Sequence, residues 1–342
     1  MKNMGGTRFG TILERAIAIL RSMAVEARPD VSPVETGASA VRLLPDFLIV
    51  GAPRCGTTFM YEYLDQHPQI YMSPIKEPQH FATDLDSGSY LDSLSFMRDR
   101  QTYRSLFDGA RPDQLTGEAS TWHLYSKDAA RNIKATNPEA RIIIMLRDPV
   151  EMLYSLHGRR HYGGSEDLAD FGEALAAEAD RKQGRRISPK ARNITALFYR
   201  DVGRYHDQVK RYLDVFGRDR VHIIIFEDFR ADPAAAYRAT LAFLGLDPGF
   251  EPDFNVVNAS AARRSWRLQQ LLLSPHVIRA ARIVFPRRVR PYVGRIWDSI
   301  NTRDEKRPAL DPNVAASLRD ELRPDVQRLG ALIGRDLTAL WS

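Results

Sequence analysis

Residues 47–58 read Phe-Leu-Ile-Val-Gly-Ala-Pro-Arg-Cys-Gly-Thr-Thr, and this stretch decides the fold. The apolar run 47–50 is typical of a buried strand and stops at Gly51, and the residues after Gly56 have helical period. A strand, a tight loop and a helix in this order aim free backbone N–H groups and the positive end of the helix dipole at one point. The stretch therefore predicts a binding site for a phosphate or sulfate group.

Two further strand and helix units follow, at residues 142–161 and 221–244. Strands that alternate with helices predict an α/β fold, here a P-loop-like, mostly parallel sheet with helices on both faces. Ligands of such sheets bind beyond the carboxyl ends of the strands. The loop 51–58, Arg147 and Glu227 all follow predicted strands, so we expect the site at this edge.

Length and composition predict one large domain with extensions. The chain has 342 residues, of which 44% are hydrophobic and 27% charged, as in ordinary globular proteins. Helical spacing over 8–27 and a linker rich in proline, serine and glycine make 1–44 an N-terminal helical appendage. We expect the core at 45–260, and a basic helical segment at 261–342 that completes the domain.

The chain has one cysteine, Cys55, which excludes an intramolecular disulfide framework and favours a reducing compartment. No run of about 18 apolar residues is present, and charges interrupt the N-terminal apolar stretch before it reaches signal-peptide length. We therefore expect a cytoplasmic protein that is peripheral to a membrane at most.

The positive charge is concentrated near the C-terminus. The whole chain carries +6, yet residues 263–307 hold twelve Lys or Arg against three acidic residues and include Trp266, Phe285, Tyr292 and Trp297. Two interpretations stay open: a solvated pair of basic helices, or a lid over the substrate that docks on anionic lipid or acidic glycan.

The loop 51–58 is close to a P-loop but departs from it at one position. The spacing approximates GxxxxGK[ST], but Thr57 stands where a nucleoside-triphosphate enzyme has lysine, and the cation lies earlier, at Arg54. A nucleotide kinase is thereby disfavoured. A turn that binds nothing, or a nucleotide-binding module without catalysis, stays as an alternative.

Two motifs resemble those of sulfotransferases that use 3'-phosphoadenosine 5'-phosphosulfate (PAPS). PRCGTT at 53–58 resembles the PKSGTT and RKGGT loops that hold the 5'-phosphosulfate, with arginine in the usual lysine place. LRDPVEMLYS at 146–155 resembles the family's 3'-phosphate motif, an arginine at a strand end with a serine eight residues on. KEPQHF (76–81), GEAS (117–120) and FEDF (226–229) follow the family order. The similarity covers about 45–260 and is strongest to bacterial and heparan-sulfate-type enzymes.

The resemblance implies PAPS as co-substrate and adenosine 3',5'-bisphosphate as product. The implied nucleotide contacts come from the first loop, from the 3'-phosphate motif and from the start of the basic segment: Arg54, Cys55, Gly56, Thr57, Thr58, Arg147, Ser155 and Arg264. Arg54 would also stabilise the leaving oxygen. Asn258, Ser260 and Arg263 match the family's last nucleotide segment only loosely.

The resemblance also implies a base that takes the acceptor's proton. Glu77 in KEPQHF occupies the place of the catalytic glutamate of glycan sulfotransferases. Two alternatives stay open: Glu77 pairs only with Lys76 or Arg54, or His123 is the base, as in enzymes that act on phenols and small alcohols.

We expect the acceptor to be a hydroxyl of a carbohydrate or glycolipid. No metal is expected, because the sequence lacks an HExxH motif and cysteine pairs. No nucleic-acid partner is expected, and the sequence leaves the oligomeric state open.

Overall fold

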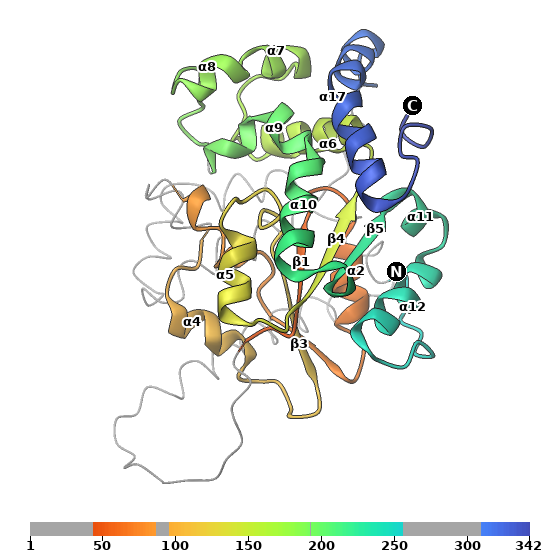
Figure 1. Cartoon of the computed structure of the whole chain (residues 1–342). Coiled ribbons are helices and arrows are strands. Elements are labelled where there is room, and N and C mark those ends of the chain that lie inside the picture. The colour runs from red at the N-terminus through yellow and green to blue at the C-terminus, as the bar shows by residue number, and fades with distance from the viewer. Residues whose placement is uncertain (1–43, 87–95, 192, 256–308) are drawn as a thin grey trace, which may run out of the picture. The chain divides into compact units, whose positions relative to one another are not determined.

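A five-stranded parallel sheet forms the centre of the protein (Figure 1). The computed structural model describes residues 44–86, 96–191, 193–255 and 309–342. The strand order is β2-β3-β1-β4-β5, and every neighbouring pair is parallel. The strands are β1 (Phe47–Gly51), β2 (Ile70–Met72), β3 (Leu115–Ala119), β4 (Arg141–Leu146) and β5 (Val221–Ile225). The predicted α/β fold is confirmed.

The three strands that the sequence predicted are β1, β4 and β5, which lie side by side in the sheet. Every residue of β1 is buried, as are the last five residues of β4. The hydrophobic pattern of the sequence did not predict β2, because it has only three residues, or β3, because its sequence LTGEA is not an apolar run. Gly117 suits the middle of β3 because a Cβ atom there would lie 2.2 Å from the ring of Phe47 on the neighbouring strand.

Helices follow the strands and cover the sheet. The helix expected in the unit 221–244 is present over Pro233–Leu244. The helices that surround the sheet and its carboxyl edge are α2 (Thr57–Leu64), α4 (Arg100–Arg104), α5 (Ala129–Thr136), α6 (Pro149–Tyr162), α7 (Phe171–Ala176), α8 (Glu178–Lys182), α9 (Tyr199–Gly203), α10 (Tyr205–Phe216), α11 (Phe226–Ala231), α12 (Pro233–Leu244) and α17 (Pro312–Ile333). Short 3₁₀ turns lie at Thr83–Leu85, Ser105–Phe107, Ile194–Leu197 and Arg218–Arg220.

The helices pack in layers on the sheet. α2 contacts β1, β2 and β3, whereas α10 contacts β4, β5 and α5. Figure 1 shows α5 and α10 on the near side of the sheet, with β4 pointing toward α6 and α9. α17 packs against α6 and α10. The carboxyl edge of the sheet is therefore bordered by α6 and α17.

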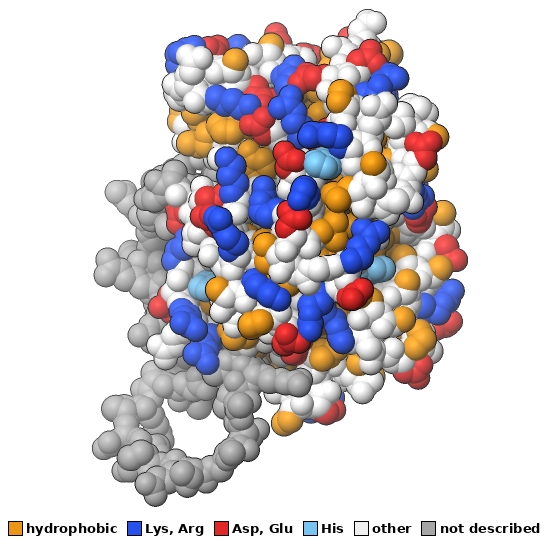
Figure 2. Space-filling model, viewed as in Figure 1, with side chains coloured by type: hydrophobic (Ala, Val, Ile, Leu, Met, Phe, Trp, Pro, Cys, Tyr) orange, Lys and Arg blue, Asp and Glu red, His pale blue; other side chains and the backbone are white. Residues whose placement is uncertain are grey.

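The surface around α5 and α10 carries mixed charge. Figure 2 shows Lys and Arg side chains interspersed with Asp and Glu on this face. Lys210 pairs with Asp214 at 2.6 Å, and Arg220 pairs with Glu139. Exposed pairs of this kind contribute little to stability, so they indicate a solvated face.

Parts of the predicted organisation lie outside the described residues. These are residues 1–43 of the appendage and residues 256–308, which include the basic segment 263–307. Among the helices that the structure describes, none has the length and apolar character needed to cross a membrane.

Candidate functional site

The loop 51–58 joins β1 to α2 at the carboxyl edge of the sheet. Arg54 and Gly56 have φ values of +65° and +86°. A Cβ atom on Gly56 would lie 2.9 Å from the ring of Phe226, so both the backbone angle and the packing favour glycine. Gly56 is the N-cap of α2 and has no side chain that could accept from the first N–H groups of the helix. These N–H groups also have no partner within the helix. The loop therefore leaves N–H donors at the start of α2, an arrangement suited to bind an anion.

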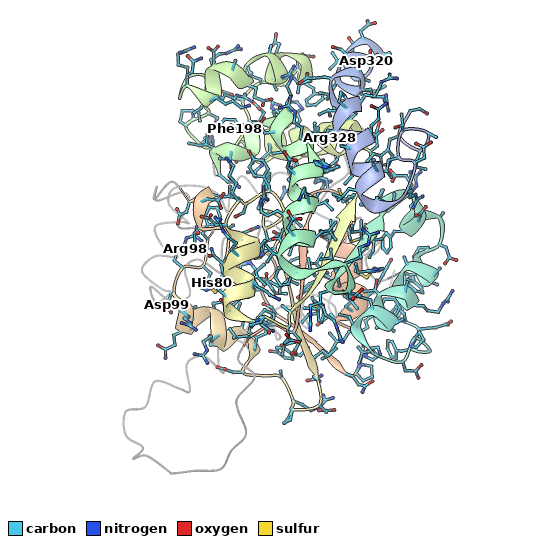
Figure 3. The ribbon with its side chains drawn as sticks, viewed as in Figure 1. His80, Arg98, Asp99, Phe198, Asp320 and Arg328 are labelled. Carbon is cyan, nitrogen blue, oxygen red and sulfur yellow. The ribbon has the colours of Figure 1, made fainter. Side chains whose placement is uncertain are left out.

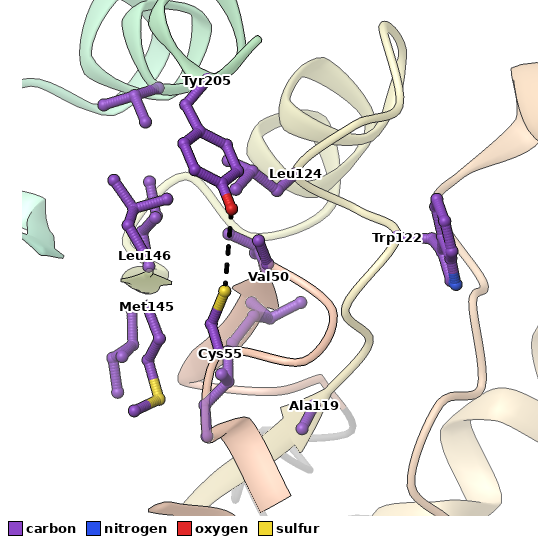
Figure 4. Close-up of a cluster of buried hydrophobic side chains, with 14 of the residues drawn as sticks. Val50, Cys55, Ala119, Trp122, Leu124, Met145, Leu146 and Tyr205 are labelled. Carbon is purple, nitrogen blue, oxygen red and sulfur yellow. Dashed lines mark hydrogen bonds between the residues drawn. The ribbon is translucent and has the colours of Figure 1, made fainter. Parts of the chain in front are cut away.

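Within this loop, the Cys55 side chain packs into the hydrophobic core (Figure 4). Its side chain is fully buried, and its Sγ lies 3.8 Å from the hydroxyl oxygen of Tyr205 and 3.5 Å from the carbonyl oxygen of Pro53. Burial raises the pKa of the Cys55 thiol to about 12. The side chain is therefore a neutral packing group, and only the backbone of Cys55 remains as the predicted nucleotide contact.

The structure brings the two predicted phosphate elements together. Arg54 Nε donates to Ser155 Oγ at 2.9 Å, although the two residues are 101 positions apart. Arg54 follows β1, whereas Ser155 lies on α6, which follows β4, and β1 pairs with β4. The neighbouring strands thus place the cation of the first motif beside the serine of the second.

Arg147 follows β4 at the same edge. Its Nη2 lies 3.4 Å from Glu151 Oε2, and its guanidinium carbon lies 5.0 Å from the centre of the Phe226 ring. Asp148, the neighbour that could have neutralised it, caps α6 and pairs with Arg319 Nη2 at 3.0 Å. The Arg147 side chain is 23% exposed. A partly exposed guanidinium on an aromatic face is suited to bind a phosphate.

The Glu77 carboxylate is held by several donors. Its Oε1 lies 2.7 Å from Lys76 Nζ and accepts from Thr121 Oγ1 at 3.1 Å. Its Oε2 accepts from Gln79 Nε2 at 2.6 Å and from the Thr121 N–H at 2.8 Å. The side chain is nevertheless 31% exposed. The carboxylate is therefore both oriented and accessible.

His123 lies in the interior. Its side chain is fully buried, with Nδ1 at 3.3 Å from Glu118 Oε1 and Nε2 accepting from the Phe81 N–H at 3.4 Å. Because the ring has no exposed surface, a substrate proton cannot reach it in this arrangement. This placement favours a packing role over the alternative in which His123 is the base.

Of the groups that orient Glu77, the sequence had named only Lys76, which pairs with it, and had not identified Thr121 or Gln79. Thr121 lies two residues beyond the end of β3, directly after GEAS, and Gln79 lies within KEPQHF. The available signal was that both motifs follow neighbouring strands, because β2 pairs with β3. Polar residues after adjacent parallel strands meet at one edge of the sheet.

The remaining predicted contacts lie outside the described part of the chain. These are Arg264 and its neighbours Asn258, Ser260 and Arg263. Within the residues that the structure describes, no group of three or more His, Cys, Asp or Glu side chains could hold a metal ion.

The chain is similar to known sulfotransferases. The model of the sulfotransferase domain family matches residues 44–260. A crystal structure of a sulfotransferase from Alicyclobacillus acidocaldarius has 33% sequence identity and a TM-score of 0.64, and the match covers 86% of this chain and 98% of that one.

Curated relatives include carbohydrate sulfotransferase 15 of Mus musculus, which is 28% identical over 69% of this chain and 50% of its own length. Bifunctional heparan sulfate N-deacetylase/N-sulfotransferase 4 of Mus musculus is 27% identical over 60% of this chain and 23% of its own length. The chain thus spans about half the length, or less, of these two relatives. The match over most of the described core, together with the shared fold, shows that the chain belongs to the sulfotransferase family.

Proposed function

We propose that the protein transfers the sulfuryl group of PAPS to a hydroxyl of a carbohydrate or glycolipid, with Glu77 as the general base. The observation that carries this proposal is the contact between Arg54 and Ser155 at 2.9 Å. It joins a loop that presents N–H donors to a second anion-binding element that also contains Arg147. A nucleotide with a 5'-phosphosulfate and a 3'-phosphate has two anionic groups that match two such elements.

The transfer is an in-line displacement at sulfur. The acceptor oxygen forms a bond to sulfur, the bond between sulfur and the bridging phosphate oxygen breaks, and adenosine 3',5'-bisphosphate leaves. Arg54 and the N–H groups at the start of α2 are suited to stabilise the charge that develops on the leaving oxygen. The acceptor's proton passes to the Glu77 carboxylate.

The setting of Glu77 supports its assignment as the base. Lys76, Gln79 and the N–H of Thr121 all donate to the carboxylate and hold it in one orientation. A carboxylate that is oriented before the reaction loses little orientational freedom during proton transfer. The alternative base, His123, is fully buried and has both ring nitrogens directed at protein groups.

The acceptor is proposed as a glycan because two curated relatives are named for carbohydrate and for heparan sulfate. The aromatic and basic segment 263–307 is the proposed contact with an anionic acceptor surface or with anionic lipid. We also propose a cytoplasmic location, since the single cysteine is a free thiol and suits a reducing compartment.

Ligand-induced thermal stabilisation tests the nucleotide assignment. Adenosine 3',5'-bisphosphate should raise the melting temperature, whereas ATP with Mg²⁺ should have a much smaller effect. Acceptors are then screened with labelled PAPS. Stabilisation by ATP with Mg²⁺ but not by the bisphosphate would overturn the proposal, and transfer to phenols but not to glycans would overturn the acceptor class.

A further inference from the structure

The loop that carries Glu77 has an unusual backbone. Glu77 and Gln79 have φ values of +63° and +53°, and Pro78 lies between them. Residues other than glycine rarely adopt positive φ, because the Cβ atom crowds the backbone. Such strain persists only where surrounding groups hold it, and it is frequent at active sites. The groups that hold this loop therefore also fix the position of Glu77.

A buried carboxylate lies behind the loop. Glu118, near the end of β3, is fully buried, and its Oε2 accepts from Ser120 Oγ at 3.1 Å. Ser120 Oγ in turn accepts from the N–H of Gln79 at 2.9 Å. Gln79 Nε2 donates to Glu77 Oε2 at 2.6 Å. Glu118 is thus linked through Ser120 to the backbone of Gln79, and the side chain of Gln79 is hydrogen-bonded to the Glu77 carboxylate.

His123 holds the loop at a second point, the backbone of Phe81. The Phe81 N–H donates to His123 Nε2, so this nitrogen is an acceptor and the ring hydrogen is assigned to Nδ1. Nδ1 lies 3.3 Å from Glu118 Oε1, an ion-pair distance, although the geometry forms no hydrogen bond between these two atoms. Glu118 and His123 thus hold the backbone at two points, Gln79 and Phe81.

The outer side of the loop has a separate clamp. Arg98 Nη1 donates to the carbonyl oxygen of Gln79 at 3.2 Å, and Arg98 Nη2 donates to that of Ala82 at 3.4 Å. His80 stacks on Tyr103 with the ring centres 4.1 Å apart. Figure 3 shows His80 and Arg98 close together, on the side of α5 away from α10. The inner network is therefore the part of the support that reaches Glu77 itself.

We propose that Glu118 and His123 are positioning residues that keep the Glu77 carboxylate in its reactive orientation. This inference rests on the proposed function of Glu77. A buried carboxylate is costly unless it is hydrogen-bonded, and hydrophobic residues often replace buried ionic pairs without loss of stability. Because Glu118 and His123 bond to the strained loop through Ser120 and Phe81, their role is to hold its geometry.

Loss of Glu118, of His123 or of the linking Ser120 should lower kcat without lowering the affinity for the nucleotide. Misplacement of a reacting group by about 1 Å can cost roughly 10²-fold in rate. We expect Glu118→Gln, Ser120→Ala and His123→Phe each to lower kcat by about 10- to 100-fold. The KM for PAPS and the Kd for adenosine 3',5'-bisphosphate should stay within about twofold, because no nucleotide-binding element is touched.

A matched series at His123 separates hydrogen bonding from packing. Asparagine can place an N–H near the position of Nδ1, glutamine can place an acceptor near that of Nε2, and phenylalanine preserves only the ring. His123→Asn and His123→Gln should therefore retain more activity than His123→Phe. The reverse order would mean that His123 only fills space, and it would overturn the proposal.

Hydrogen exchange gives a readout that does not depend on activity. Exchange of the segment 77–82 should become faster in Glu118→Gln and in His123→Phe. Asp325→Asn serves as the control, because Asp325 is also a buried carboxylate that accepts from a backbone N–H, that of His206, but it lies on α17. This control should leave exchange at 77–82 and kcat unchanged. Unchanged exchange at 77–82 in the test variants would overturn the positioning role, whatever the activity.

The effect must also disappear when Glu77 no longer acts. In a Glu77→Gln background, His123→Phe should cause no further loss of kcat, because its effect passes through the missing carboxylate. Additive losses would contradict the proposal. A wild-type protein that neither binds adenosine 3',5'-bisphosphate nor transfers sulfuryl groups would instead contradict the proposed function, and faster exchange at 77–82 would still establish the structural network.

Discussion

Two loops at the carboxyl edge of the sheet are held in opposite ways. The loop 51–58 is held by packing, since Cys55 is buried beneath it and Gly56 lies against the Phe226 ring. The loop 76–81 is held by hydrogen bonds, which run from Glu118 and His123 to its backbone through Ser120 and Phe81. Both follow strands of one parallel sheet, so the sheet alone does not explain the difference.

The difference follows from the charge that each loop handles. A loop that binds an anion must leave its N–H donors free, so apolar packing against the core has to fix its conformation. A loop that carries a carboxylate can use donors to orient that carboxylate, as Lys76, Gln79 and Thr121 do for Glu77. The predictions below test this contrast one loop at a time.

The largest effect is expected for Glu77→Gln. Glutamine keeps the size of glutamate but cannot accept the acceptor's proton, so kcat should fall by roughly 10²- to 10⁴-fold. Affinity for adenosine 3',5'-bisphosphate should stay nearly unchanged. Steady-state kinetics and calorimetric titration of the bisphosphate measure the two quantities. An active Glu77→Gln together with an inactive His123→Ala would move the base to the histidine and the acceptor toward a phenol or small alcohol.

A smaller effect is expected for Arg147→Ala and Ser155→Ala. Loss of the charged contact in Arg147→Ala should lower the binding free energy of adenosine 3',5'-bisphosphate by about 1.5 to 3 kcal/mol. The loss should be smaller for Ser155→Ala, because serine is a neutral donor. Binding of adenosine 5'-phosphate should change much less, because it lacks the 3'-phosphate. Titration of both ligands against each variant is the measurement. Equal losses for the two ligands would contradict the assignment of these residues to the 3'-phosphate.

A still smaller effect is expected for Gly56→Ala, which tests the packed loop. The positive φ alone should cost about 1 to 2 kcal/mol of folding stability in a non-glycine residue. The added Cβ atom would also meet the Phe226 ring at 2.9 Å. Chemical denaturation should show this loss, and bisphosphate binding should weaken as well. Gly334→Ala is a matched control, because Gly334 is also in the left-handed helical region, with φ of +74° and ψ of +35°, but no described atom lies within 4 Å of its Cβ position.

The same contrast explains which parts of the site could be predicted from the sequence. The motifs 53–58 and 146–155 identify the phosphate elements because N–H donors and cations must recur at fixed spacing from a strand end. The supports of Glu77 were not predictable in this way. His123 was recognised only as an alternative base, since its hydrogen bond with the Phe81 N–H and its closeness to Glu118 depend on side-chain positions that no spacing specifies.

The smallest effect concerns Cys55 and the pH dependence of folding. A thiol at the N-terminus of a helix is often more acidic than usual, but burial raises the pKa of Cys55 from 9.0 to about 12. A folded-state pKa above the unfolded value means that the stabilisation is fully present below pH 9 and is lost as the pH rises from 9 toward 12. Cys55→Ala removes this titration and leaves no other cysteine in the chain.

The difference in unfolding free energy between wild type and Cys55→Ala should therefore shrink by about 1.4 kcal/mol between pH 7 and pH 10. Urea denaturation of both proteins at the two pH values measures it. A thiolate stabilised by the helix dipole and Arg54 would have the opposite sign, because its folded-state pKa would lie below the unfolded one. The difference would then widen as the pH rises toward the unfolded value, and the interpretation of the loop 51–58 as a packed, neutral support for its N–H donors would be wrong.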